Sequence, residues 1–249
     1  MIEHMQASWE PKRVGVNRRP VVFVSSSVYD KEDMLRQIYE LLATNGYEPW
    51  MSFKGSIAAS SFRSAFGNCV RAVEDADFFI GIISPWYGSG VEKDDPDSIS
   101  ITHQEMRKAR ELRLPRLLLV DDRVVVVRKF LDSLGFKHKE GRLRFRMLLA
   151  SENGDKDAFL KASHSCDLRS IDLYDEMTLG EPNDPAVKPA NRIGNWIQQF
   201  KDINDVKTFL AAQFSYLRWP VPYVGNAEAV SRIGEAFRVI NLDGKRGVR

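Results

Sequence analysis

Short apolar runs alternate with longer amphipathic stretches along the first 120 residues of the chain. Wholly apolar runs are typical of strands that are buried on both faces, and residues 21–24 form such a run. Further strands are predicted at 47–51, at 78–84, which is the most apolar of them, and at 116–120. Between them, apolar residues recur at spacings of three and four, which indicates amphipathic helices. The pattern predicts helices from about Asp30 to Leu42, from Ser60 or Ser61 to Val73, and from about Thr102 to Leu112.

This alternation of strands and helices predicts an α/β domain with a doubly wound, flavodoxin-like parallel sheet. Right-handed crossovers between parallel strands place helices on both faces of such a sheet. Ligands then bind beyond the carboxyl ends of the strands. We therefore expect the functional site in the loops that follow Val24, Ser84 and Val120.

The second half of the chain has a less regular pattern. We interpret residues 1–19 as a flexible leader, 20–135 as the α/β domain, and 136–249 as a C-terminal extension that is mixed at first and then helical. Within this half, alternation predicts strands at 142–147, with a basic face that protects a sheet edge, and at 170–174. Residues 124–134 fit a strand that runs into a helix, and 181–189 a linker. Helices are predicted around 193–200, 209–217 and 226–240.

Composition narrows the classes of function. The chain is 43% hydrophobic and 28% charged, and 36 basic against 34 acidic residues give a net charge of +2. This profile favours an ordinary globular protein. The small net charge creates no overall positive potential that would attract nucleic acid or an anionic membrane. No apolar stretch is long enough to cross a membrane, the leader lacks a signal-peptide segment, and Cys69 and Cys166 stand in no metal-ligand spacing. We expect a cytoplasmic protein without a metal.

Common nucleotide and metal motifs are missing from the sequence. It contains no phosphate-binding loop, no G-x-G-x-x-G after a strand, no H-E-x-x-H and no C-x-x-C. Nucleotide kinases, classical dehydrogenases and metalloenzymes are therefore disfavoured.

Two loops at the predicted strand ends carry candidate binding residues. Ser25, Ser26 and Ser27 follow the first strand, where small hydroxyl residues leave backbone N–H groups open to a phosphate or ribose. They also fit a plain strand-to-helix turn, with Asp30 as the helix cap. Trp86 and Tyr87 follow the most apolar strand; they could stack on a base or nicotinamide ring, or simply cover the core.

Glu105 is the candidate catalytic residue. It lies at the start of a predicted helix near the strand ends, where a carboxylate could stabilise positive charge that develops on a sugar. Its spacing from Thr102 offers a structural alternative, because Thr-x-x-Glu is also a capping box in which the glutamate accepts the backbone N–H of the threonine. Spacing alone favours the structural role.

Three ordered blocks resemble the domain-of-unknown-function family 4062. They are Val22-Phe23-Val24-Ser25-Ser26-Ser27-Val28-Tyr29-Asp30, Asp77 to Ile83 continued by Trp86-Tyr87-Gly88-Ser89, and Ser100-Ile101-Thr102-x-x-Glu105-x-x-x-Ala109. That family is similar in fold to TIR domains and nucleoside 2-deoxyribosyltransferases, which cleave N-glycosidic bonds with a glutamate at a helix start. The resemblance implies that Glu105 is catalytic and that Ser25, Ser26 and Tyr87 contact substrate. Ser27 stands where the family has Thr, which keeps the hydroxyl.

The resemblance and the chemistry together suggest cleavage of NAD. Nicotinamide in NAD is already cationic and leaves without a proton, so one carboxylate can suffice, whereas a neutral base needs a proton donor as well. The hypothesis makes NAD the substrate, needs no cofactor, and assigns substrate binding to Ser25, Ser26, Ser27, Asp30, Trp86 and Tyr87. A TIR-like hydrolase or cyclase of bacterial immune signalling would be a homo-oligomer, with a further partner protein bound through the second half. The alternatives are a non-catalytic module that binds a nucleotide signal or a protein, and a deoxyribosyltransferase or nucleotide N-glycosidase.

Overall fold

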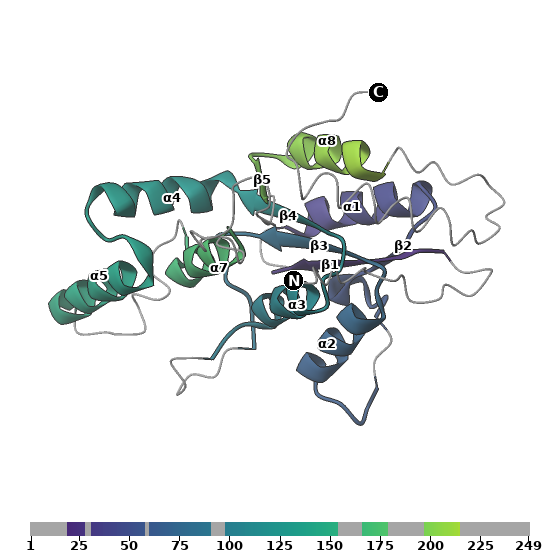
Figure 1. Ribbon diagram of the computed structural model, residues 1–249, viewed down its shortest axis with the longest axis horizontal. Helices are drawn as coiled ribbons and strands as arrows, with labels where there is room; N and C mark the ends of the chain where they lie inside the picture. Colours follow the sequence, from purple (N-terminus) through teal and green to yellow (C-terminus); the bar gives the residue numbers. More distant parts are fainter. Residues whose placement is uncertain are drawn as a thin grey trace, which may run out of the picture.

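A five-stranded parallel sheet forms the centre of the molecule (Figure 1). The computed structural model describes residues 19–27, 31–57, 60–90, 98–153, 166–178 and 197–214. The strands run in the order β2-β1-β3-β4-β5, with every neighbouring pair parallel. This is the flavodoxin-like order, so the predicted doubly wound α/β fold is confirmed. The strands are β1 (Val21–Ser26), β2 (Glu48–Trp50), β3 (Phe78–Ile83), β4 (Arg116–Asp121) and β5 (Ile197–Phe200).

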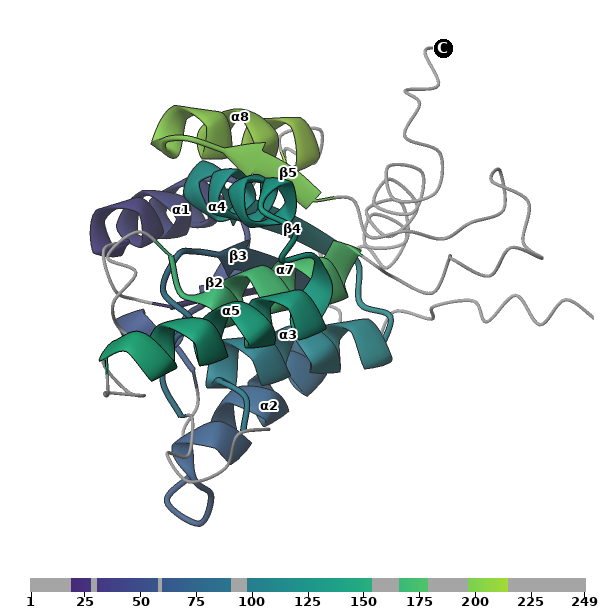
Figure 2. The same ribbon diagram turned by 90° about the vertical axis from the view of Figure 1, so that its left-hand side faces the viewer.

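Helices cover both faces of the sheet (Figures 1 and 2). They are α1 (Glu32–Thr44), α2 (Ala65–Asp75), α3 (Ile101–Glu111), α4 (Asp122–Ser133), α5 (His138–Asn153), α7 (Leu168–Thr178) and α8 (Ile203–Phe214), with a short 3₁₀ turn η1 (Ser52–Lys54). Because successive strand side chains point to opposite faces, Val21 and Phe23 pack with α2, α3, α4 and α7, while Val22 and Val24 pack with α1 and α8. The two hydrophobic cores therefore lie on either side of one sheet.

Two segments predicted as strands are helical, and both predictions are wrong. Residues 142–147 lie in α5 and residues 170–174 lie in α7. The arginines of α5 do not share a basic face: Arg142 is buried and binds Asp172 and Asp175 at 2.6 Å each, whereas Arg144 is exposed. A charged side chain can occupy a buried position when carboxylates pair with it, so the alternation of charged and apolar residues here does not mark an exposed and a buried face.

The end of the sheet also differs from the prediction. Residues 197–200 form β5 and not a helix, and they pair with β4 from Leu118↔Ile197 to Asp121↔Phe200. The sheet thus includes a strand from the segment assigned to the C-terminal extension. Residues 124–133 belong wholly to α4, without the predicted strand, because the side chain of Asp121 caps this helix directly after β4. The helix predicted at 209–217 is confirmed as far as Phe214 by α8. The leader, the linker at 181–189 and the helix predicted at 226–240 lie outside the described residues.

Candidate functional site

A serine and a glutamate meet at the carboxyl end of the sheet. Ser25, in β1, donates a hydrogen bond of 2.5 Å from Oγ to Oε2 of Glu105, in α3. Ser25 is 1% exposed and Glu105 is 4% exposed. Buried carboxylates are uncommon, and one that lies at the strand ends of a doubly wound sheet is a candidate for chemistry.

The start of α3 rules out a capping-box role for Glu105. Ser100 is the cap of this helix, and its side chain accepts a 3.2 Å hydrogen bond from the backbone N–H of His103. The helix therefore begins at Ile101, and Thr102 is inside it. The capping box predicted from Thr102 and Glu105 is wrong, because a capping box needs its hydroxyl residue at the cap position. Glu105 lies beyond the first turn.

A glycine lets α3 approach the sheet. Gly81, in β3, is the direct neighbour of Ser25 in the strand register. A Cβ atom at position 81 would lie 2.7 Å from Cδ2 of Leu118 and 3.0 Å from Cε of Met106 in α3. Contacts that short do not occur between packed carbon atoms, so a side chain here would push α3 outward. The absence of one brings the helix close enough for Glu105 to reach Ser25.

Burial sets the protonation of Glu105. Loss of water around its side chain raises the pKa to about 7, although hydrogen bonds from Ser25 and Cys69 act to lower it. Cys69 lies in α2, and burial together with the neighbouring charge of Glu105 raises the pKa of its thiol to about 12. The thiol therefore stays protonated and donates. Near neutral pH the Glu105 carboxyl is about half ionised.

The other two serines of the loop point elsewhere. Ser27 and Ser84 share a hydrogen bond of 2.5 Å between their hydroxyls, which ties the end of β1 to the end of β3. Ser26 donates to the carbonyl oxygen of Ser27 at 2.9 Å. Of the three serines, Ser25 is the one that donates to Glu105 among the contacts of the described residues. Asp30 lies outside the described part of the chain.

Tyr87 is fixed by a chain of polar contacts. Its hydroxyl lies 2.6 Å from Nδ1 of His103, and Nε2 of His103 lies 2.9 Å from Oε2 of Glu176 in α7. The Arg169 guanidinium covers one face of the Tyr87 ring at 4.8 Å. Trp86 is different: its side chain is exposed, at 42%. Of the two aromatic residues predicted to stack on substrate, Trp86 presents the more open ring.

Ser25, Tyr87 and Glu105 lie in a segment that a family model matches. Residues 21–140 match the family described as Domain of unknown function (DUF4062). These residues form a DUF4062 domain. No curated protein matches the chain. The match confirms the family predicted from the three sequence blocks, and it covers Ser25, Tyr87 and Glu105 but ends before α7.

A residue outside the DUF4062 domain thus contributes to the network at its strand ends. Glu176 accepts hydrogen bonds from Arg107 at 2.7 and 2.8 Å and from Arg110 at 3.0 Å, besides its contact with His103. Burial acts to raise the pKa of Glu176, but the hydrogen bonds from His103 and Arg107 hold it well below its usual range. Sequence reasoning missed Glu176 because it predicted a strand at 170–174 in place of the helix α7, which carries this residue.

A second ion pair lies at the end of β4, within the DUF4062 domain. Asp121 accepts a hydrogen bond of 2.7 Å from Nζ of Lys31 and two of 3.0 Å from the side chain of Arg123. Burial acts to raise the pKa of Asp121, but the hydrogen bonds from Arg123 and Lys31 outweigh it, so the pKa is lowered. Lys31 precedes α1, so this pair joins the segment after β1 to β4. The sequence signal for it was weak, because a lysine and an aspartate 90 residues apart carry no local pattern.

Two absences in the described ranges bear on ligands and membranes. No cluster of three or more His, Cys, Asp or Glu side chains there has the arrangement of a metal site. Among the helices so described, none combines the length and the apolar character needed to cross a bilayer.

Proposed function

We propose that this protein is a TIR-like enzyme that consumes NAD by cleaving its nicotinamide–ribose bond, as a hydrolase or a cyclase. The observation that carries the proposal is the buried carboxyl of Glu105, held by Ser25 at the carboxyl end of β1 with a pKa of about 7. Keeping a carboxylate in such a place is costly, and functional sites are where proteins accept that cost.

The chemistry needs one negative charge close to the ribose. As the glycosidic bond breaks, its electron pair goes to the pyridinium nitrogen, and nicotinamide leaves as a neutral molecule. Positive charge then develops on the ribose ring, where ionised Glu105 would stabilise it. In the hydrolase, water adds to the ribose carbon and releases its proton to solvent. The cyclase would use a nucleophile of the substrate itself in place of water.

The surrounding residues suit this role. Ser25 and Cys69 donate to the carboxyl of Glu105 and occupy positions that ribose hydroxyls could take over. The linked hydroxyls of Ser27 and Ser84 lie at the adjacent strand ends, where a phosphate could bind. Trp86 offers an exposed ring for stacking on nicotinamide or adenine. NAD is the substrate in this scheme, and no cofactor is required.

The decisive experiment follows nicotinamide release from NAD by the purified protein. Glu105→Gln keeps the shape and a hydrogen-bonding group at this position while removing the charge. We expect the wild type to release nicotinamide and the variant to release at least about 100-fold less, since a positioned charged group contributes on this scale. Turnover by the variant at the wild-type rate would remove Glu105 from the mechanism. Saturable nucleotide binding without turnover by the wild type would favour a non-catalytic signal-binding module.

The pKa of Glu105 supports a second candidate, a nucleotide N-glycosidase or deoxyribosyltransferase. A carboxyl that is half protonated near neutral pH can also donate a proton to a neutral leaving base. The pH profile separates the two reactions. Stabilisation by the ionised form requires a rate that rises as pH passes through about 7, whereas proton donation requires a rate that falls there.

The proposal also concerns the setting of the enzyme. We place it in the cytoplasm, where NAD is abundant, as a homo-oligomer that acts in bacterial anti-phage signalling, with a partner protein bound through its second half. Depletion of NAD would be its effect on the cell. Measurement of cellular NAD after expression of the wild type and of Glu105→Gln tests this setting.

A further inference from the structure

Exposed apolar side chains gather on one pair of helices. Of the eight large apolar side chains that are exposed in the described ranges, six belong to α4, α5 and the turn between them: Val126, Phe130, Leu134, Leu143, Met147 and Leu148. We call these six residues the α4–α5 face. Single exposed apolar residues are common on proteins, but a contiguous group marks an interaction site.

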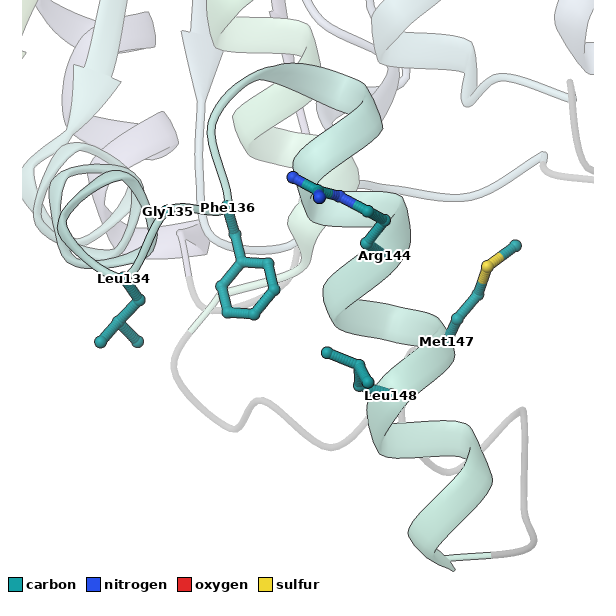
Figure 3. A pocket seen from close by; sticks show the side chains of 6 residues that line it. All are labelled: Leu134, Gly135, Phe136, Arg144, Met147 and Leu148. Carbon is teal, nitrogen blue, oxygen red and sulfur yellow. The ribbon is translucent and has the colours of Figure 1, made fainter.

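The α4–α5 face combines exposed apolar residues of two helices that run in different directions (Figure 3). Val126, Phe130 and Leu134 follow one another at intervals of four, so they form a ridge along α4. Leu143 and Met147 form a second ridge along α5. At the end of α4, a hollow of about 400 Å³ is lined by Leu134, Phe136, Arg144, Met147 and Leu148, and Phe136 and Leu148 face each other across it (Figure 3).

Positive charge lies beside the α4–α5 face. Lys129 and Arg146 stand three positions along the helix from Val126 and Leu143, and Arg144 lines the hollow. Within the part of the chain that the structure describes, these three side chains form no ion pair or hydrogen bond. The neighbouring carboxylates are already engaged: Asp132 pairs with Arg128, and Asp175 pairs with Arg128 and Arg142. Glu140, in the first turn of α5, is an exposed acidic residue of this region.

We propose that the α4–α5 face binds an amphipathic α-helix of another protein, with acidic side chains on both sides of its apolar stripe. The apolar ridge of α4 can pack against a helix whose own apolar residues recur at three and four. Acidic flanks would pair with Lys129, Arg144 and Arg146. A second copy of this chain fits less well. A two-fold contact would bring these cations close to the same cations of the second copy, and like charges repel.

The test uses two synthetic helical peptides and the full-length chain. One peptide has leucine along one face and glutamate on both sides of it; the other has lysine in place of every glutamate. Binding is followed by fluorescence anisotropy at low salt, where charge pairing is strongest. We expect the glutamate peptide to bind at least ~10-fold more tightly, a factor that corresponds to a few exposed ion pairs.

Surface variants locate the binding. Phe130→Asp should abolish it, and Arg144→Glu should reduce the preference for the glutamate peptide. Phe62→Asp is the matched control, because Phe62 is 98% exposed but lies outside the α4–α5 face. All three positions are on the surface, so the variants keep the fold.

Four results would overturn the proposal. Equal affinity for the two peptides would remove the role of charge, and binding of neither would show that no such helix fits. A concentration-dependent dimer that Phe130→Asp abolishes would assign the face to a second copy. Co-sedimentation with phosphatidylserine vesicles that is lost in Phe130→Asp would assign it to a membrane surface. The proposal does not depend on catalysis by Glu105.

Discussion

Ser25 and Glu105 are separated by 80 residues of sequence and joined by a hydrogen bond of 2.5 Å on the buried side of β1. The contact depends on two features of the backbone. Ser100 starts α3 two residues earlier than Thr102 would, and Gly81 keeps the sheet open beneath the helix. A serine that follows a buried strand and a glutamate inside a helix thereby form one site.

Glu105→Gln should stabilise the protein at alkaline pH. Below pH 4.5 the carboxyl is protonated in both the folded and the unfolded chain, so it makes no difference to unfolding. As pH rises from 4.5 to about 7, the unfolded chain ionises first, and the folded wild type loses about 3 kcal/mol of stability. The variant has no group that titrates there. Urea unfolding should therefore show the variant more stable than the wild type at pH 8 and the difference much reduced at pH 5.

The control for this prediction is Glu111→Gln. Glu111 ends the same helix, but its side chain is 69% exposed and forms a surface pair with Lys108. We expect that change to alter the free energy of unfolding by less than about 0.5 kcal/mol. A Glu105→Gln variant that is no more stable than the wild type at pH 8 would mean that the carboxyl of Glu105 is well solvated.

Ser25→Ala should move the pH midpoint of activity upward. The hydrogen bond from Ser25 lowers the pKa of Glu105, so its loss raises that pKa further. If the ionised form is the active one, activity at pH 7 falls and recovers as the pH is raised. Ser26→Ala is the control, because the hydroxyl of Ser26 donates to the carbonyl of Ser27. Initial rates measured across pH for both variants decide the matter; a common midpoint would place Ser25 outside the site.

Arg142→Ala should destabilise the protein strongly. Arg142 is 2% exposed and pairs with Asp172 and Asp175, so the variant removes the cation that Asp172 binds and leaves Asp175 with Arg128 alone. Removing one member of a buried ion pair costs about 3–5 kcal/mol. Arg144→Ala, two positions along α5 and exposed, should change stability by less than about 0.5 kcal/mol. Similar midpoints of thermal unfolding for the two variants would contradict the burial of Arg142.

The parts of the fold that sequence predicted are those whose pattern is local. β1, β3 and β4 each contain a continuous apolar run, and α1 to α3 carry clear apolar stripes. Each of these elements can therefore be predicted from its own local sequence. β5 was mistaken for a helix because Ile193, Trp196, Ile197 and Phe200 have helical spacing. Its pairing with β4 decided its conformation, and such long-range pairing overrides local preference.

The site was predicted in part for the same reason. The position of Glu105 near the strand ends followed from the order of the elements, but its partner did not. Ser100 and Thr102 are both good caps, and spacing could not tell which of them starts α3. Glu176 comes from α7, whose fold position depends on ion pairs such as Arg142 with Asp175. Contacts of that kind leave no periodic signal in the sequence.

Glu176→Gln should separate binding from catalysis. Glutamine can still bind His103, but it cannot hold Arg107 and Arg110 as a carboxylate does. Hydrogen bonds to charged groups contribute about 1.5–3 kcal/mol each, and partial exposure of Glu176 reduces this, so we expect a loss of about 1–3 kcal/mol in stability. The neutral glutamine holds His103 less firmly than the carboxylate does, so Tyr87, held through His103, would become less ordered, which should raise KM for NAD and leave kcat within about twofold.

The matched control is Glu111→Gln, which removes a carboxylate from the exposed end of α3 without touching this chain of contacts. It should leave both kinetic constants unchanged. A fall in kcat with an unchanged KM in Glu176→Gln would contradict the positioning role, because it would place Glu176 in the chemical step itself. Unchanged kinetics together with the expected loss of stability would show that the contact between α7 and α3 is purely structural.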